Sequence, residues 1–347
     1  MKFADDSAGI LEPPVAARAR ALHCGAMSTR IRPSATLFSL LAVLCWSSST
    51  HAGGLPVRTE SSLARGILLP ALGQSPDDSG WRWQIDLTNE FVLAQNGSES
   101  LVLDAETASL RLAETVQINA DWFAGAELQL LRTGGGFMDS LIEDWHEFFG
   151  LPNAGRERRP QDQYLIRYER DGNTVMEASK ADSGLGDLQL WLGKRLSPHW
   201  SWRSAVKLPT GDDQTLLGNG EFGLASWLDS HYSSGAWSGF LALGGSYNPA
   251  GASLAALRRE WTGFGGAGLN WQWTRWLKLR GQVNAHTALF EDTRIEALER
   301  PGVQLTLGAG LRFGETEVNL AFQEDIVTQS SPDFSLHLSW HWRQDAR

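Results

Sequence analysis

The sequence has few of the features that hold together or anchor most chains of its size. It contains two cysteines in 347 residues, Cys24 and Cys45, and both lie near the N-terminus. A disulfide framework is therefore excluded for the remaining chain. No run of about 18 apolar residues occurs, the length that a spanning helix requires. With a mean hydropathy of −0.25, this excludes a membrane protein built from helices.

Basic residues are also in deficit, with 30 Lys and Arg against 40 Asp and Glu and a formal net charge of −10. This acidity argues against a nucleic-acid partner. Tryptophan and glycine, in contrast, are abundant, at 16 and 36 residues. So much tryptophan is unusual in a soluble core. It is typical of membrane barrels, whose aromatic girdles lie at both interfaces.

The N-terminal region reads as an export signal. Arg30 and Arg32 are followed by the apolar run LFSLLAVLCW at 37–46, which is too short to span a membrane, and Ala52 is a plausible cleavage point. We therefore predict that residues 1–52 are an upstream extension plus a signal peptide, with translation starting at Met27. Removing their five basic and three acidic residues changes the net charge from −10 to −12.

Both cysteines would leave with this segment. Cys45 could instead be a lipoprotein cysteine, but Leu44 occupies the position where such a signal has a small residue. The predicted mature chain has no thiol.

The stretch 261–287, WTGFGGAGLNWQWTRWLKLRGQVNAHT, indicates the fold. Apolar or small residues alternate with polar ones in both halves, and only Thr274, Arg275 and Trp276 separate them. Alternation with period two marks strands with two different faces. Each arm has about ten residues, the length that a tilted strand needs to cross a bilayer. The pattern predicts a transmembrane antiparallel β-barrel.

The same pattern recurs along 81–347, which we predict to be the barrel. Connections alternate between short and long, and most tryptophans gather at the short-turn side, as expected for a periplasmic aromatic belt. We count twelve strands, or fourteen if a hairpin at 164–180 enters the wall. The last strand ends at Trp342 and would be the segment that the barrel assembly machinery binds. Residues 53–80 are irregular and proline-containing, and form either a periplasmic tail or a plug.

One long extracellular loop, 132–184, carries a predicted amphipathic helix at 137–149. Its apolar face either lies on the outer leaflet or barrel rim, or caps the mouth as a lid hinged at 134–136. The residues that would then contact solute are Phe137, Leu141, Trp145, Phe148 and Phe149.

Charged and polar residues on the other strand faces should point into the lumen, which is either water-filled or packed with ion pairs. The predicted lumen-lining residues are Arg82, Asp86, Glu90, Asp187, Arg203, Lys207, Lys278, Arg280, His286 and Arg312.

Nothing in the sequence predicts catalysis, a cofactor or a metal site. His337 and Ser339 form an H-x-S on the last strand, a relation that outer-membrane phospholipases use. Their face should be the lumen, however, and no third group that orients the imidazole can be identified. The histidines are dispersed without metal-ligand spacing.

Three stretches carry a family resemblance: GGGFMDSLIEDWHEFFGLPNAGR at 134–156, SGLGDLQLWLGKRL at 183–196 and KLPTGD at 207–212. With them the chain resembles an uncharacterised family of proteobacterial outer-membrane barrels, domain-of-unknown-function family 3187. The resemblance implies the outer membrane of a Gram-negative bacterium, with lipid and lipopolysaccharide as surroundings. It supplies neither a substrate nor catalytic residues.

From these patterns we expect a passive channel or uptake pore for small solutes, hydrophobic ones among them. The alternative is a closed structural or envelope-maintenance barrel with an extracellular interaction loop. An outer-membrane lipid enzyme is a third reading.

Overall fold

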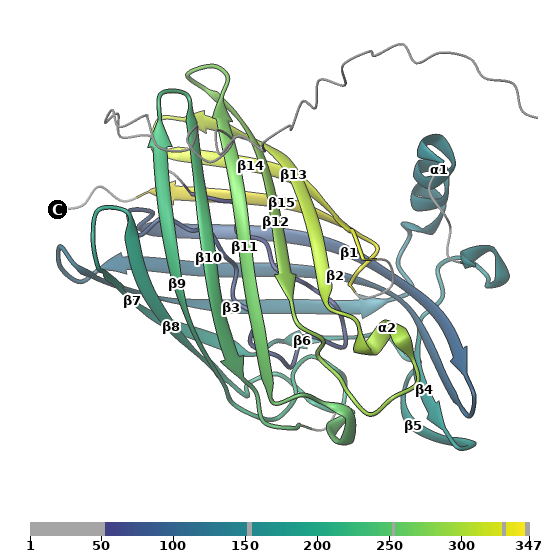
Figure 1. The fold of residues 1–347 in the computed structure, drawn as a ribbon. Coiled ribbons are helices and arrows are strands. Elements are labelled where there is room, and N and C mark those ends of the chain that lie inside the picture. The colour runs from purple at the N-terminus through teal and green to yellow at the C-terminus, as the bar shows by residue number, and fades with distance from the viewer. Residues whose placement is uncertain (1–52, 151–154, 252–253, 328–330, 344–347) are drawn as a thin grey trace, which may run out of the picture. The chain divides into compact units, whose positions relative to one another are not determined.

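The structure, a computed structural model, describes residues 53–150, 155–251, 254–327 and 331–343. Within them, twelve antiparallel strands form a closed ring (Figure 1). In ring order the strands are β1 (Gly80–Asn96), β2 (Glu99–Gln117), β3 (Trp122–Gly134), β7 (Leu188–Arg195), β8 (Trp200–Leu208), β9 (Gly223–Ser234), β10 (Trp237–Tyr247), β11 (Trp261–Gln272), β12 (Leu277–His286), β13 (Gly302–Phe313), β14 (Thr316–Asp325) and β15 (Phe334–Arg343).

The ring closes where the first strand meets the last. β1 pairs with β15, with Trp83 opposite Trp340, and pairs on its other side with β2. The hairpin of β4 (Leu165–Arg170) and β5 (Asn173–Ala178) pairs only with the first residues of β2, where Leu101 faces Tyr168. It therefore extends beyond the wall. The prediction of twelve strands is confirmed, and the alternative of fourteen is wrong.

A short strand, β6 (Asp182–Leu185), pairs with the end of β3 and is continued by β7 on the same strand edge. Gly186 and Asp187 separate β6 from β7. The turn between β9 and β10 is tight, because β9 continues to Ser234 and leaves only Gly235 and Ala236 outside strands. The remaining elements are η3 (Arg156–Arg158), η4 (Ala255–Leu257) and α2 (Glu296–Glu299).

The outer face of the ring is apolar. Exposed tryptophans concentrate at the short-turn end, and their rings stack across strands, with 5.7 Å between the centroids of Trp237 and Trp271 and 6.1 Å between those of Trp271 and Trp273. At the opposite end Trp261 lies 5.0 Å from Tyr247. In a closed ring the backbone N–H and C=O groups on both edges of each strand are hydrogen-bonded, as a structure in hydrocarbon requires. The fold is a transmembrane barrel of the outer-membrane type.

Among the described residues, no helix combines the length and the apolar character needed to cross a membrane.

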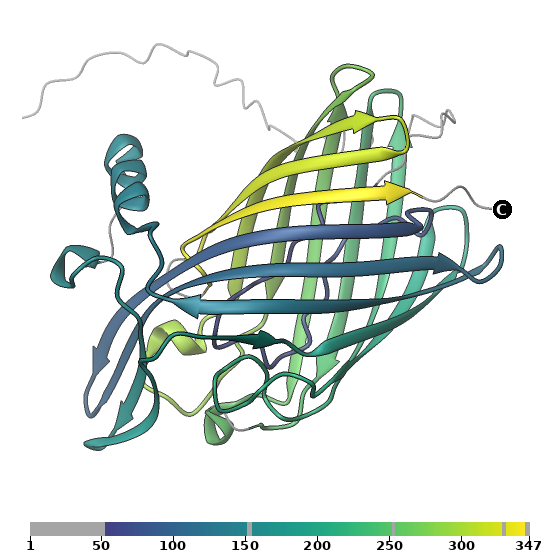
Figure 2. The ribbon, with the colours of Figure 1, turned by 180° about the vertical axis from the view of Figure 1, so that it is seen from behind.

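Helix α1 (Asp139–Phe149) lies against the outside of the barrel. Met138 and Ile142 are buried in a cluster with Phe334, packed on Leu87, Phe322 and Leu336. These strand residues share the face of the exposed Ile85, Leu320 and Leu338, which is the lipid-facing side. The ring of Trp145 adds contacts at 6.0 Å to Phe322 and 6.2 Å to Phe334. In Figure 2 the helix stands outside the ring, near the strand ends that lead to the long loops.

Of the two expected positions, the helix takes the one on the barrel wall and not the one over the mouth. Trp145 packs on the outer wall, whereas Phe137, Leu141 and Phe148 are 64%, 53% and 81% exposed. The side chain of Phe149 lies outside the described residues. The helix turns part of its apolar face to the wall because that wall offers an apolar surface.

The predicted hinge is also packed rather than free. A methyl group at Gly135 would lie 1.9 Å from the carbonyl oxygen of Asp162, and Gly136 has a φ of +73° beside Glu106. One carboxylate oxygen of Glu106 accepts hydrogen bonds from the backbone N–H groups of Phe137 and Met138. These N–H groups precede the first turn of α1, so β2 fixes the start of the helix.

Candidate functional site

The N-terminal segment of the described chain, residues 53–79, runs through the interior of the ring (Figures 1 and 2). We call it the plug. Its first residues are bound by amide side chains of β11 and β12. Gln282 Oε1 accepts from the N–H of Leu55 at 2.8 Å, and Gln282 Nε2 donates back to the Leu55 carbonyl at 3.2 Å. Asn284 donates to the carbonyl of Val57, and Asn270 to that of Gly53, both at 3.2 Å. These bonds satisfy backbone groups that no sheet pairs.

The middle of the plug is bound by the opposite wall. Glu90 on β1 accepts from both the N–H and the hydroxyl of Ser62, at 2.8 and 2.6 Å. The Arg65 guanidinium donates to the hydroxyls of Thr133 and Thr107. Further along, Asn248 beyond β10 accepts from the N–H of Leu68 at 2.6 Å. The plug is therefore attached to the wall on several sides.

Apolar side chains complete this attachment. Ile67, Leu68, Leu69 and Leu72 are buried in one cluster with inward residues of β9, β10 and β11, namely Trp227, Phe240 and Phe264. A methyl group at Gly73 would lie 2.4 Å from the Phe240 ring, so the plug backbone passes directly over that ring. This cluster was not predicted from the sequence, because the inward face was assigned to polar residues. The signal was present in the three aromatic residues on that face.

A buried ion network joins the plug to β1, β2 and β3. Arg58 contacts Glu60 at 3.1 Å and Glu127 at 3.0 Å, and Arg111 contacts Asp86 at 2.9 Å. Arg82 reaches Glu127 at 3.3 Å, and Arg111 also lies 3.7 Å from Glu60. Three guanidinium groups thus face three carboxylates. Removing one member would leave an uncompensated buried charge, which is strongly destabilising.

The predicted lumen-lining residues are mostly inside the ring and paired. Beyond those in the network and Glu90, Lys207 bonds Asp187 at 2.6 Å, Arg203 bonds Asp229 at 3.2 Å, and Arg280 pairs with Glu317. Lys278 and His286 are buried as well. Arg312 differs: it is exposed at the end of β13 and donates to the Gly314 carbonyl in the adjacent turn. Of the two expected interiors, the described one is packed with ion pairs.

Cavities remain between the plug and the wall of the described barrel, and four of them follow one another. The outer cavity has an empty volume of about 490 Å³, part of it open to solvent, and lies at the long-loop end beside α2. The second, third and inner cavities have empty volumes of about 370, 390 and 410 Å³, with solvent included.

These cavities follow one another along the plug. The outer and second cavities share Thr59 and Ala64 as lining residues. The second and third share Arg58 and Gln189, and the third and inner share Gln74 and Arg82. At each junction at least one shared residue belongs to the plug. Neighbouring cavities are thus adjacent, with plug side chains between them.

The H-x-S pair of β15 lies in the interior of the barrel. His337 Nδ1 bonds Asp86 at 2.6 Å, so the orienting carboxylate that the sequence did not reveal is Asp86. Ser339, however, accepts from Asn319 at 3.2 Å, and both residues of the pair are buried. In the described part of the chain, no three metal-ligating side chains come together.

Comparison with solved structures finds other barrels. An outer-membrane channel of Pseudomonas putida F1 is 16% identical, covering 79% of this chain and 96% of that one, with a TM-score of 0.46. The CymD monoaromatic hydrocarbon channel is 12% identical over 78% and 90%, with a TM-score of 0.41. The NanC porin is 7% identical over 76% and 100%, with a TM-score of 0.40. At these scores the likeness says nothing about the solute.

No curated protein matched the sequence. The family comparison is more informative, because it extends from the predicted signal core through the plug to the last strand of the barrel. One family model matches residues 37–344, and its description is "Protein of unknown function (DUF3187)". By that match, the chain belongs to the DUF3187 family.

Proposed function

We propose that the barrel is a passive outer-membrane channel for small solutes, hydrophobic ones among them, and that the plug holds it closed. The observation that carries the proposal is the row of four cavities, in which plug residues form part of every junction. A solid structural barrel needs no such row. A shift of the plug would join the cavities into a continuous route without breaking any strand pair.

The proposal includes the export of the chain and its insertion into the outer membrane. Residues 1–52 act as the export signal and its upstream extension, and cleavage after Ala52 leaves Gly53 as the first residue of the plug. The C-terminal strand that ends near Trp342 is the segment offered to the barrel assembly machinery. Outer-membrane lipid and lipopolysaccharide surround the exposed apolar face.

A second candidate is a closed envelope-maintenance barrel with an extracellular interaction surface. It is favoured by α1, whose Phe137, Leu141 and Phe148 side chains are exposed beside the lipid-facing wall. In that case the plug would be permanent packing. The two candidates differ in one measurable property, which is whether the route along the plug ever opens.

Single-channel conductance in planar bilayers tests this directly. The chain from Gly53 should show rare, brief openings, and a chain lacking residues 53–79 should conduct steadily. A folded but non-conducting deletion variant would overturn the channel proposal. Folding is checked independently by circular dichroism and by tryptophan fluorescence in lipid vesicles.

A reversible variant avoids dependence on the deletion. The Cβ of Leu68 lies 3.1 Å from the position of a methyl group at Gly223 on β9, close to the ~3.5–4.5 Å that a disulfide needs. Because the predicted mature chain has no other cysteine, Leu68→Cys with Gly223→Cys should form a single cross-link. Openings should cease when it is oxidised and return on reduction. The single-cysteine variants are the controls, and equal conductance in both redox states would contradict a moving plug.

A further inference from the structure

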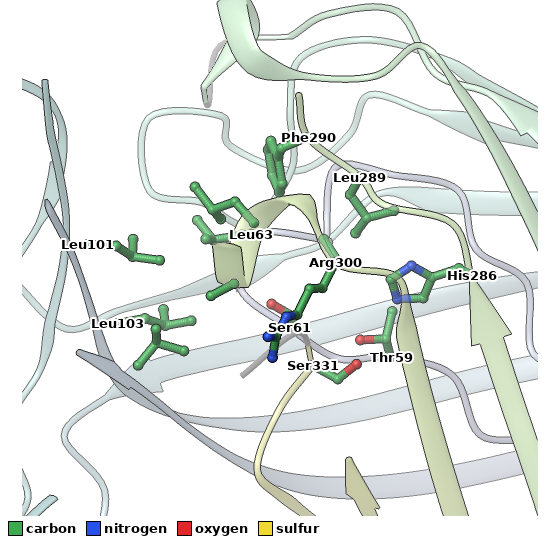
Figure 3. A pocket seen from close by; sticks show the side chains of 14 residues that line it. Thr59, Ser61, Leu63, Leu101, Leu103, His286, Leu289, Phe290, Arg300 and Ser331 are labelled. Atoms are coloured by element: carbon green, nitrogen blue, oxygen red, sulfur yellow. The ribbon is translucent and has the colours of Figure 1, made fainter. Parts of the chain in front are cut away.

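The outer cavity has an apolar side and a polar side (Figure 3). Leu101 and Leu103 of β2 lie on one side, with Leu63 of the plug next to them. His286, Thr59 and Ser331 gather on the other side. They come from the end of β12, the plug and the segment before β15. Cavities with apolar walls and a few convergent polar groups are the usual form of small-molecule sites.

The polar side holds three buried atoms without a hydrogen-bond partner among the described residues: His286 Nε2, Ser331 Oγ and Thr59 Oγ1. His286 and Ser331 are each 8% exposed. Buried polar atoms in folded proteins are nearly always paired. Three unpaired atoms on one side of one cavity therefore require a partner with hydrogen-bonding groups.

The tautomer of His286 defines which group that is. Its Nδ1 lies 2.8 Å from the carbonyl oxygen of Thr287. A carbonyl only accepts, so Nδ1 carries the proton, and in the neutral ring Nε2 is left as an acceptor. The missing partner must donate to Nε2. The hydroxyls of Ser331 and Thr59 can donate to the same partner if it also has acceptor lone pairs.

A hydroxyl group donates once and accepts twice, and so fits all three atoms. A carboxylate cannot donate to Nε2. The guanidinium of Arg300, which also lines the cavity, is already paired with Glu296, with Nε of Arg300 at 3.0 Å from the carboxylate. The cavity therefore offers no unpaired cation to an anion.

We propose that the outer cavity is a binding site for a small, uncharged, mainly apolar molecule that carries a hydroxyl group. The hydroxyl lies among His286, Ser331 and Thr59, and the apolar body lies against Leu63, Leu101 and Leu103. This site rests on the proposed function, since it is the first cavity that a solute meets from the long-loop end. Its ligand is the class of solute that the route admits.

Gly302 provides a way to fill the polar side. A methyl group there would lie 2.2 Å from His286 Nε2 and 2.8 Å from Ser331 Oγ. Gly302→Ala should therefore displace the imidazole and block the position of the hydroxyl. The matched control is Gly281→Ala, where the added methyl would meet only the flexible end of Leu307, at 3.3 Å.

Isothermal titration of the chain from Gly53 in detergent micelles tests the site with three probes of one size: phenol, toluene and benzoate. Phenol should bind saturably, about tenfold or more tighter than toluene, because toluene leaves the polar atoms unpaired. Benzoate should not bind. Gly302→Ala should abolish phenol binding. The heat measured when phenol is titrated into this variant in the same detergent gives the background from partition of phenol into micelles. Gly281→Ala should bind phenol as the parent does.

Thr59→Val and Ser331→Ala separate binding from structural packing. Each removes a hydroxyl without a partner, so the melting temperature should stay the same or rise, whereas phenol affinity should fall several-fold. If the hydroxyls were structural, stability would fall instead. The ¹⁵N chemical shift of His286 Nε2 should move on addition of phenol and remain unchanged with toluene.

Absence of saturable phenol binding in a folded parent chain would overturn the proposal and leave ordered water as the partner of the three atoms. Equal affinity for phenol and toluene would equally contradict a hydroxyl site. Neither outcome depends on conductance. Failure of this site is therefore distinguishable from failure of the channel, which the plug variants test.

Discussion

Lys207 Nζ on β8 lies 2.6 Å from Asp187 Oδ2, and the lysine is completely buried. The same ammonium donates to Asn219 and to the carbonyl of Glu221, each at 2.7 Å. The other carboxylate oxygen of Asp187 accepts from the N–H of Gly211 at 2.9 Å. The stretches GLGD and KLPTGD, which are separate in the sequence, thus interlock and tie the loop after β8 to the rim.

Lys207→Met should unfold the rim loop and destabilise the barrel by about 3–5 kcal/mol, because Asp187 would remain buried without its counter-charge. Urea unfolding in lipid vesicles, followed by tryptophan fluorescence, measures this. The double variant Lys207→Met with Asp187→Leu should lose much less free energy of unfolding. A double variant as unstable as the single one would show that the loop depends on the bonds to Asn219 and Glu221 rather than on charge balance.

Arg58→Met should loosen the plug, because Arg58 is the plug guanidinium that contacts Glu127 of the wall at 3.0 Å. We expect openings of the channel to become more frequent by at least several-fold, and stability to fall. Arg167→Met is the matched control: its ion pair with Glu177, at 2.9 Å, is half-exposed on the hairpin outside the ring, and such pairs contribute about 0–1 kcal/mol. Identical conductance of the two variants would contradict a role of Arg58 in closure.

Trp145→Ala should lower the free energy of unfolding by no more than about 5 kcal/mol. It should leave conductance unchanged, because the indole packs on Phe322 and Phe334 at the outer wall. Phe148→Ala, at a side chain that is 81% exposed, should change stability less. Bilayer recordings of both variants are the measurement. A rise in conductance in Trp145→Ala would restore the idea that the helix covers the mouth.

Phe240→Ala should open a cavity under the plug, since this ring lies within the apolar cluster and against the backbone at Gly73. The expected loss is about 3–5 kcal/mol, with larger conductance as the plug loses its support. Leu241→Ala is the control on the same strand, because Leu241 faces outward and is 57% exposed. The comparison requires both variants to be measured in the same lipid.

The wall of the barrel could be predicted from the sequence because its signal is local. A residue such as Leu338 alternates with His337 and Ser339 within a few positions, and period two gives the face of each. The twelve-strand ring followed from counting such segments. The outward position of Trp340 and Trp342 followed in the same way.

The interior could not be predicted in this way, because its partners are far apart in the chain. Nothing local in Leu55 points to Gln282, and Asp86 shows no sign of Arg111 or His337. The helix face at Trp145 was recognised, but its partner surface comes from β14 and β15, nearly two hundred residues later. Periodicity gives the direction of a side chain and not the identity of what it meets.

The position of the plug has a consequence for assembly. Leu55 bonds Gln282, 227 residues further along the chain, and the ring is sealed only when β15 pairs with β1. The backbone around Leu55 can therefore form these hydrogen bonds only when strands far later in the chain are in place. Contacts between such distant parts are entropically costly to form early, and they slow folding. The last seam of the wall closes around a segment that precedes every strand of that wall in the chain.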